Sequence, residues 1–64
     1  MPLVEITLTT GRDPELLRGL MGEVHEAVMR AIGVPATSVR VVLREVPPEH
    51  WLSGGITIAE RSST

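Results

Sequence analysis

A proline next to the first methionine is the residue of this chain whose chemistry is most informative. The chain begins Met1-Pro2-Leu3, so removal of one initiator methionine would leave Pro2 as the N-terminus. A terminal proline nitrogen is a secondary amine that can accept a proton, whereas a proline inside the chain has only an amide. An ordinary α-amino group has a pKa of about 7.7–8.0. Burial and nearby cations lower that pKa, so Pro2 is a candidate general base at neutral pH.

Two arginines and the one tryptophan could complete a site around Pro2. Arg12 follows a glycine in a turn, Arg40 interrupts an apolar segment, and Trp51 lies in a loop flanked by prolines and glycines. A guanidinium inside an apolar segment must find water, an acid or a ligand. Each residue also has a plainer interpretation: Arg12 as a solvated turn residue, Arg40 at an outward-facing strand position, and Trp51 as a filler of a core or an interface.

The histidines and the remaining helix charges have a structural interpretation. His25 and His50 are too far apart in sequence for a local zinc motif, so no metal is expected. We expect His50 in a loop and His25 on the polar side of a helix. The charges predict a solvated helix face; they are Glu15, Arg18, Glu23, Glu26 and Arg30.

The elements that must position these residues follow from residue patterns. Residues 3–8 are rich in β-formers and predict a strand, as do residues 38–45. Between them, Asp13 as N-cap and Pro14 at the first helical position predict a helix over 14–32 that ends at Gly33. A strand, a long helix and a second strand form a β-α-β unit with parallel strands. The fold class is therefore α+β, with a short C-terminal strand or hairpin predicted over 56–59 and a polar tail over 60–64.

Length and composition predict one domain over residues 1–64 that needs other copies of itself. A chain of 64 residues buries too little surface to be more than marginally stable alone, and the absence of cysteine excludes disulfides. One helix over a two-stranded sheet leaves edges open and one face uncovered. We therefore expect an obligate oligomer.

Charge and hydropathy exclude several classes of partner. The net charge is −2, with six arginines and no lysine, which is unlike a basic nucleic-acid-binding surface. No apolar run approaches the ~20 residues of a membrane span, and the N-terminus lacks the pattern of a signal peptide. We expect a cytoplasmic protein with no nucleic-acid or membrane partner.

The order and spacing of these features are similar to those of the 4-oxalocrotonate tautomerase family. They are Pro2, Gly11-Arg12, Arg40 within 37–41, and Trp51 before Gly54-Gly55, and together they cover nearly the whole chain. The resemblance implies a β-α-β unit assembled into a homohexamer, a trimer of dimers, with a heterohexamer as an alternative. It also implies a cofactor-independent isomerase for small enol or keto acids.

The resemblance implies roles for individual residues. After removal of Met1, the Pro2 amine would shuttle a proton in the 1,3- or 1,5-keto-enol tautomerisation of a 2-hydroxymuconate-like dienol acid, a substrate type from aromatic-ring catabolism. Arg12 would bind the distal carboxylate and draw electrons toward it, and Arg40 would contact the 2-hydroxy or keto oxygen and the adjacent carboxylate. Trp51 takes the place of an aromatic, usually Phe, that keeps the pocket apolar.

Two further positions would line the pocket: the main chain at Leu8 and the side chain of Ser38. The resemblance also implies that the groups of one site come from more than one subunit.

Departures from the family pattern bear on the identity of the substrate, and two alternative functions are also considered. The loop after Trp51 reads Leu52-Ser53-Gly54-Gly55, where the family commonly has a glycine in place of Leu52. A 3-haloacrylate dehalogenase or hydratase of the same superfamily would place an acid at Ser53 and an arginine at Thr9, and both are absent. A non-catalytic subunit of a heterohexamer is the other alternative. The physiological substrate is left open.

Overall fold

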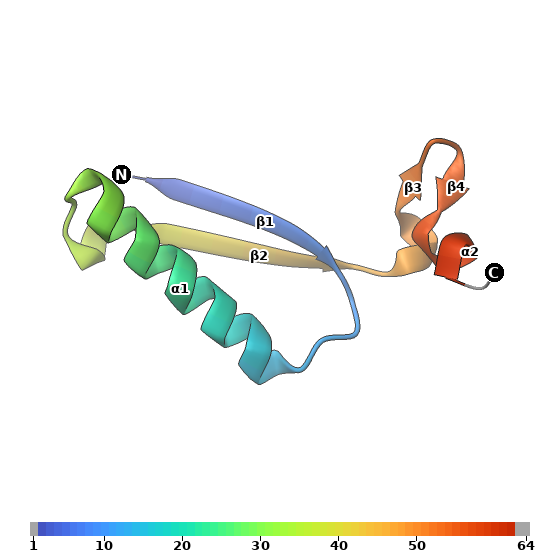
Figure 1. Cartoon of the computed structure of the whole chain (residues 1–64), viewed down its shortest axis with the longest axis horizontal. Coiled ribbons are helices and arrows are strands. Elements are labelled where there is room, and N and C mark those ends of the chain that lie inside the picture. Colours follow the sequence, from blue (N-terminus) through green and yellow to red (C-terminus); the bar gives the residue numbers. More distant parts are fainter. Residues whose placement is uncertain (1, 63–64) are drawn as a thin grey trace.

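A pair of parallel strands crossed by one long helix forms the frame of the chain (Figure 1). The computed structural model describes residues 2–62. β1 (Leu3–Thr9) leads into α1 (Pro14–Ile32), and the chain returns as β2 (Arg40–Val46), which pairs with β1 in parallel. The predicted β-α-β unit is confirmed. The predicted removal of Met1 and the last two residues of the predicted tail, 63–64, lie outside the described residues.

α1 begins and ends where the sequence predicts, because both of its caps are local. The Asp13 side chain accepts a hydrogen bond from the Glu15 N–H at 2.9 Å, and Pro14 occupies the first turn. At the other end Gly33 adopts a left-handed conformation (φ 68°) and its N–H donates to the carbonyl of Met29 at 2.9 Å. A glycine there avoids the clash that a Cβ would cause.

The strand pair has one covered face and one open face. In the parallel register Val4 lies beside Val41, and both are half-buried on the side toward α1. Their neighbours Leu3 and Val42 point to the opposite face, where they are 56% and 39% exposed. Figure 1 shows the helix on one side of the strands only. The second sheet face is therefore left without a cover by residues 2–62.

β2 starts two residues later than predicted. A 3-10 turn, η1 (Ala36–Ser38), occupies the predicted beginning of the strand. It is held by local bonds, since the Ser38 N–H donates to the carbonyl of Pro35 at 3.1 Å. A pattern of β-forming residues does not reveal such a turn.

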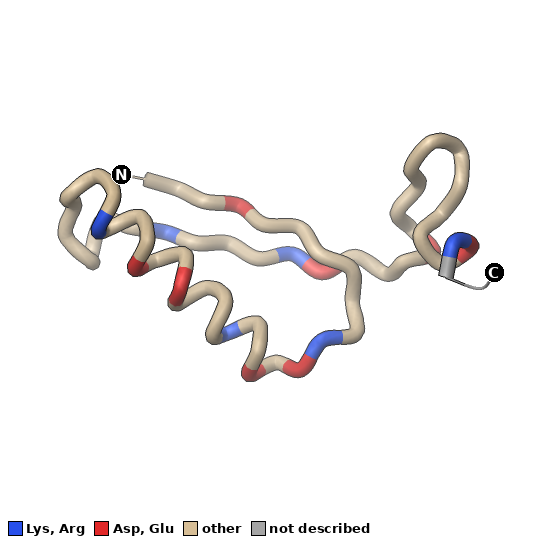
Figure 2. The backbone as a smooth tube through the Cα atoms, viewed as in Figure 1, with Lys and Arg blue, Asp and Glu red and all other residues tan. Residues whose placement is uncertain are grey.

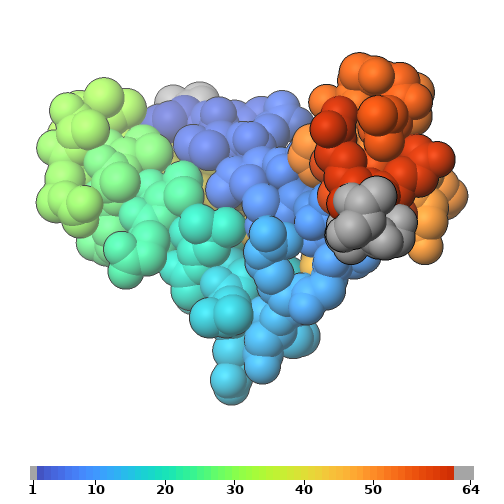
Figure 3. Space-filling view, turned by 45° about the vertical axis from the view of Figure 1, so that its right-hand side comes forward, coloured from blue at the N-terminus to red at the C-terminus, as the bar shows by residue number. Residues whose placement is uncertain are grey.

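The chain ends in a C-terminal arm, residues 47–62, that projects away from α1 (Figures 1 and 3). It contains a 3-10 turn, two two-residue strands and a short helix: η2 (Pro48–His50), β3 (Leu52–Ser53), β4 (Ile56–Thr57) and α2 (Ile58–Ser62). The predicted hairpin is confirmed, but the expectation of a strand reaching residue 59 and of a polar tail from residue 60 was wrong. Thr57 and Glu60 form reciprocal side-chain bonds to each other's N–H, at 2.7 and 3.1 Å, and this capping box starts α2.

The dimensions of the chain show that it has little core of its own. Its radius of gyration is 14.9 Å, against about 11 Å for a compact chain of this length. Leu17 is the one hydrophobic residue classed as buried within residues 2–62. Several large side chains are exposed instead: Leu3, Leu16, Ile32, Val42, Leu52 and Ile56. This surface agrees with the expectation that copies of the chain cover one another.

The Asp13 cap gives a test of how α1 is stabilised. Asp13→Ala removes the acceptor for the Glu15 N–H, and the free energy of unfolding should fall by about 1 kcal/mol. Asp13→Asn keeps an acceptor at the same place and should stay within a few tenths of a kcal/mol of the parent. Urea unfolding at one fixed protomer concentration measures both. Equal losses in the two variants would contradict a role for the cap.

Candidate functional site

Pro2 and Arg40 lie together at the starting end of the strand pair. The Arg40 N–H donates to the carbonyl of Pro2 at 3.0 Å, and Arg40 is the register partner of Leu3. Ser38 precedes Arg40 by two residues, and its hydroxyl donates to the carbonyl of Pro35 at 2.9 Å. Three of the predicted site residues therefore gather at this end of the sheet.

The guanidinium of Arg40 is available to a ligand. Arg40 is exposed and lies on the open sheet face, since it alternates with the half-buried Val41. Within residues 2–62 its side chain has no hydrogen-bond or ion-pair partner. Arg44 on the same face differs, because it pairs with Glu5 at 2.7 Å. An unpaired cation beside Pro2 is what an anionic substrate would require.

Arg12 lies at the opposite end of β1. Its Nη1 donates to the carbonyl of Thr9 at 2.9 Å, so the exposed side chain folds back on the end of its own strand. This is the geometry of the plainer interpretation, a turn arginine in solvent. Leu8, the predicted main-chain liner, is half-buried near the same end, with Glu45 as its register partner.

Trp51 belongs to the C-terminal arm. The residue is half-buried, and its carbonyl accepts a hydrogen bond from the Ile58 N–H at 2.9 Å. The turn of the hairpin beside it consists of Gly54 (φ 62°) and Gly55 (φ 82°). Two consecutive positive φ values in a two-residue loop define a type I′ turn, which glycine adopts without strain. Leu52 needs no such freedom because it lies in the extended β3.

The two groups of predicted residues do not meet within one chain. β1 has seven residues, so at about 3.3 Å per residue its two ends are about 20 Å apart. Pro2, Ser38 and Arg40 lie at one end; Leu8 and Arg12 lie near the other, with Trp51 in the arm beyond β2. Figure 2 likewise shows basic residues at both ends of the strand pair and not in one cluster. A site that uses all of them needs more than one copy of the chain.

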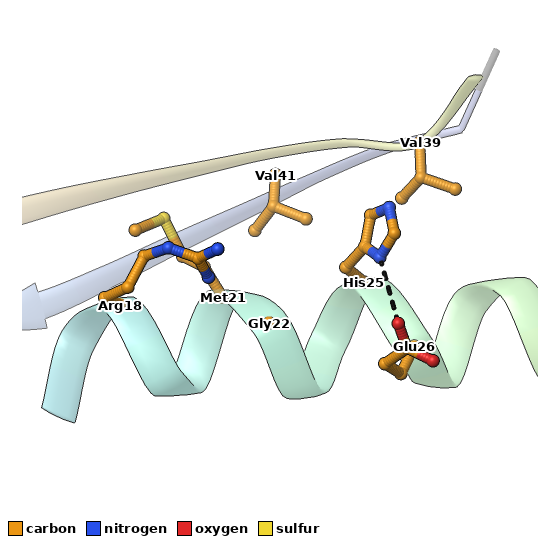
Figure 4. A pocket seen from close by; sticks show the side chains of 7 residues that line it. All are labelled: Arg18, Met21, Gly22, His25, Glu26, Val39 and Val41. Atoms are coloured by element: carbon orange, nitrogen blue, oxygen red, sulfur yellow. Dashed lines mark ion pairs between the residues drawn. The ribbon is translucent and has the colours of Figure 1, made fainter. Parts of the chain in front are cut away.

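A separate groove of about 450 Å³ lies between α1 and β2 (Figure 4). Its lining contains none of the predicted site residues and consists of Arg18, Met21, Gly22, His25, Glu26, Val39 and Val41. Arg18 and Glu26 were expected only as part of a solvated face. His25 was expected on the polar side of the helix, and that expectation was wrong. Its side chain is 29% exposed and turns toward β2.

The spacing of residues along α1 indicates that His25 lies beside the apolar stripe, although the surrounding charges favoured a place on the polar side. His25 is four residues after Met21 and three before Val28, so it borders the apolar stripe of α1. Its Nε2 lies 3.2 Å from the carbonyl oxygen of Ala36.

Neither a metal cluster nor a membrane-spanning helix is found in the described part of the chain. Residues 2–62 contain no group of three or more acidic or histidine side chains placed to hold a metal ion. The helices in this range are too short or too polar to cross a bilayer.

Comparison with known proteins gives consistent matches over most of the chain. A family model described as Tautomerase enzyme matches residues 2–61. A 2-hydroxymuconate tautomerase of Stutzerimonas stutzeri is 42% identical over 55 residues, covering 86% of this chain and 87% of the relative. A probable tautomerase of Ralstonia nicotianae is 41% identical over 56 residues, covering 88% and 80%.

Solved structures agree in fold. TomN, a 4-oxalocrotonate tautomerase homologue of the tomaymycin biosynthetic pathway, matches with a TM-score of 0.94 at 38% identity, covering 98% of this chain and 97% of TomN. A heterohexamer 4-oxalocrotonate tautomerase from Chloroflexus aurantiacus matches with a TM-score of 0.88 at 42% identity, covering 94% and 97%.

Substitutions at Gly54 test whether the turn of the hairpin fixes the position of Trp51. Gly54→Val forces a β-branched residue to a positive φ, so the hairpin should loosen and the emission of Trp51, the one tryptophan, should shift toward that of the unfolded chain. Gly54→Asn should keep the native spectrum, because Asn favours this turn position. Identical spectra for the Val variant and the parent would show that the turn does not order Trp51.

Proposed function

Since this chain belongs to the tautomerase family, we propose that it is an isomerase for a 2-hydroxymuconate-like dienol acid. The reaction moves a proton from the enol hydroxyl to a carbon of the conjugated chain, in a 1,3 or 1,5 sense, and leaves a ketone. The Pro2 amine, freed by removal of Met1, takes up the proton and returns it. No atom is gained or lost, so the reaction calls for no co-reactant.

One observation carries this proposal most directly: an arginine that is bonded to Pro2 through its backbone and whose side chain is unpaired within residues 2–62. The Arg40 backbone is bonded to the Pro2 carbonyl at 3.0 Å. Its side chain has no partner among residues 2–62, while Arg44 on the same face is neutralised by Glu5 at 2.7 Å. A base and a free cation at one end of a sheet can hold an enol acid and accept its proton.

The chemistry asks for cations where negative charge develops. As the proton leaves the hydroxyl, charge spreads along the conjugated system toward both carboxylates. In our proposal Arg40 contacts the 2-oxygen and the carboxylate next to it, and Arg12 binds the distal carboxylate. Such donors are most effective in a site that excludes water. Trp51, Leu8 and Ser38 would line that site.

The proposed site is built between chains. Arg12 and Pro2 of one chain lie at opposite ends of β1, so the Arg12 that serves a given Pro2 belongs to another copy. We propose a hexamer, in keeping with the heterohexamer tautomerase that this chain resembles. Because this chain carries Pro2, Arg12, Arg40 and Trp51 itself, identical copies would suffice.

Substitution of the proposed groups tests the function. Ketonisation of 2-hydroxymuconate should be lost in Pro2→Ala, and Arg12→Ala or Arg40→Ala should raise the barrier by about 2–4 kcal/mol each. Arg44→Ala is the matched control, because it removes an arginine from the same strand and face whose charge is already paired, and it should retain the parental rate.

Assembly and processing are checked on the same samples. Native mass spectrometry should give the hexamer for the parent and for every variant, and the mass of the denatured parent should lack Met1. Unchanged rates in Pro2→Ala, or a fully active parent that retains Met1, would end the proposed proline mechanism.

The pH profile tests Pro2 as the base. Only the neutral amine accepts a proton, so kcat/KM should fall as the pH is lowered through the pKa of the amine. Burial and the two arginines should hold that pKa below the usual α-amino value of about 7.7–8.0. Substantial activity at neutral pH is therefore expected. A rate that becomes appreciable only above about pH 9 would contradict this role.

A further inference from the structure

His25 connects the middle of α1 to the turn that precedes Arg40 (Figure 4). Its Nε2 lies 3.2 Å from the carbonyl oxygen of Ala36, the first residue of η1. The two residues are 11 apart in sequence, so this is a tertiary bond and not a local one. It spans the connection between helix and strand.

The Ala36 carbonyl is a junction in a short hydrogen-bond path. It also accepts from the Val39 N–H at 3.3 Å, so donors on α1 and on the residue just before β2 converge on it. The next residue, Arg40, donates its N–H to the Pro2 carbonyl at 3.0 Å. The path from His25 therefore leads through η1 to the two residues that the proposed function uses at this end.

The bond holds in either charge state of the ring. A carbonyl oxygen only accepts, so Nε2 carries the hydrogen. The neutral Nε2–H tautomer and the imidazolium both donate there. Nδ1 faces a Glu26 carboxylate oxygen at 3.6 Å. The ring is 29% exposed and lies in the groove opposite Val39 and Val41 (Figure 4).

Without the bond to His25, the hydrogen bonds of η1 within residues 2–62 would all be local. Within the described residues, the other hydrogen bonds of the turn run from Ser38 to Pro35 and from Val39 to Ala36, each spanning three residues. Such bonds shape the turn but do not attach it to the helix. A turn that drifts relative to α1 takes Ser38 with it and strains the backbone bond between Arg40 and Pro2 that follows.

We propose that His25 is a positioning residue, which fixes η1 against α1 through the Ala36 carbonyl and so sets Ser38 and Arg40 relative to Pro2. The proposal deepens the proposed tautomerase function and rests on it for its kinetic readout. His25 touches no substrate in this arrangement. It acts by limiting the motion of the segment that does.

Two variants separate the hydrogen bond from the bulk of the ring. His25→Leu replaces the ring with an apolar side chain of similar size that has no hydrogen-bond donor. The value of kcat/KM for 2-hydroxymuconate should then fall about 3- to 10-fold, the scale of one net hydrogen bond. His25→Gln can place an N–H near the position of Nε2 and should recover the parental value within about 2-fold. Glu26→Gln, a change at the neighbour of Nδ1, should leave kcat/KM unchanged.

Amide hydrogen exchange gives a readout that needs no activity. In His25→Leu, exchange at Ser38, Val39 and Arg40 should accelerate, while amides in the middle of the strands, such as Leu43, keep their protection. His25→Gln should restore the slow exchange. If the parent and Pro2→Ala are equally active or both inactive, the proposed function fails, and the exchange pattern still decides the role of His25.

Three results would overturn the positioning role. Equal losses in the Leu and Gln variants would assign the effect to ring shape. Parental kinetics and exchange in His25→Leu would show that the bond fixes nothing. Faster exchange spread evenly over the strands would show a general loss of stability.

Discussion

The parallel pairing of β1 with β2 is the constraint on which the rest of this molecule depends. Parallel strands start at the same end of a sheet, so the pairing places Pro2 beside Arg40 and joins them by a backbone hydrogen bond of 3.0 Å. Arg12 follows β1 in the chain, so it lies at the end of the strand opposite to Pro2. α1 then has to bring the chain back, and its length and caps serve that return. The parallel pairing thus brings the Pro2 and Arg40 part of the proposed site together and leaves the Arg12 part at the other end of the sheet.

Assembly of several chains would both bring the separated halves of the proposed site together and cover the apolar surface that one chain leaves exposed. One sheet face lacks a cover, and large side chains such as Leu3 and Leu52 are exposed at 56% and 64%. Burying them against other copies would stabilise a fold that is marginal alone. In our proposal the same contacts bring an Arg12 of one copy to the Pro2 of another. Stability and catalysis would then rest on one event, the assembly of the chains.

Whether a structural feature could be predicted from the sequence depends largely on whether the residues that cause it are neighbours in the chain. The bounds of α1 were predictable because Asp13 and Gly33 act within the adjoining turns. The β-α-β pattern predicts that Pro2 and Arg40 lie at the same end of the sheet, whereas the register that bonds them to each other was seen only in the structure. Locality was not sufficient for the turn before β2: its bonds are local, but a pattern of β-forming residues does not reveal them. The partner of His25 was missed because it lies 11 residues away on another element. A helical pattern contains no information on such a partner.

The proposed site as a whole rests on the resemblance to a family. Residue types suggested a base, two cations and an apolar wall, but no property of one chain brings Arg12 to Pro2. The arm holding Trp51 shows the same limit: its turn follows from Gly54-Gly55, whereas in our proposal the Trp51 that lines a site is brought there by assembly of the chains.

Mixing two impaired variants tests the shared site most directly. Pro2→Ala and Arg12→Ala chains are purified separately, mixed, unfolded and reassembled together, and the ketonisation rate is measured. If a site takes its base and its arginine from different chains, mixed hexamers contain some sites with both groups intact, and activity returns. If both groups come from one chain, no reassembled hexamer contains an intact site, and the mixture stays as impaired as its components.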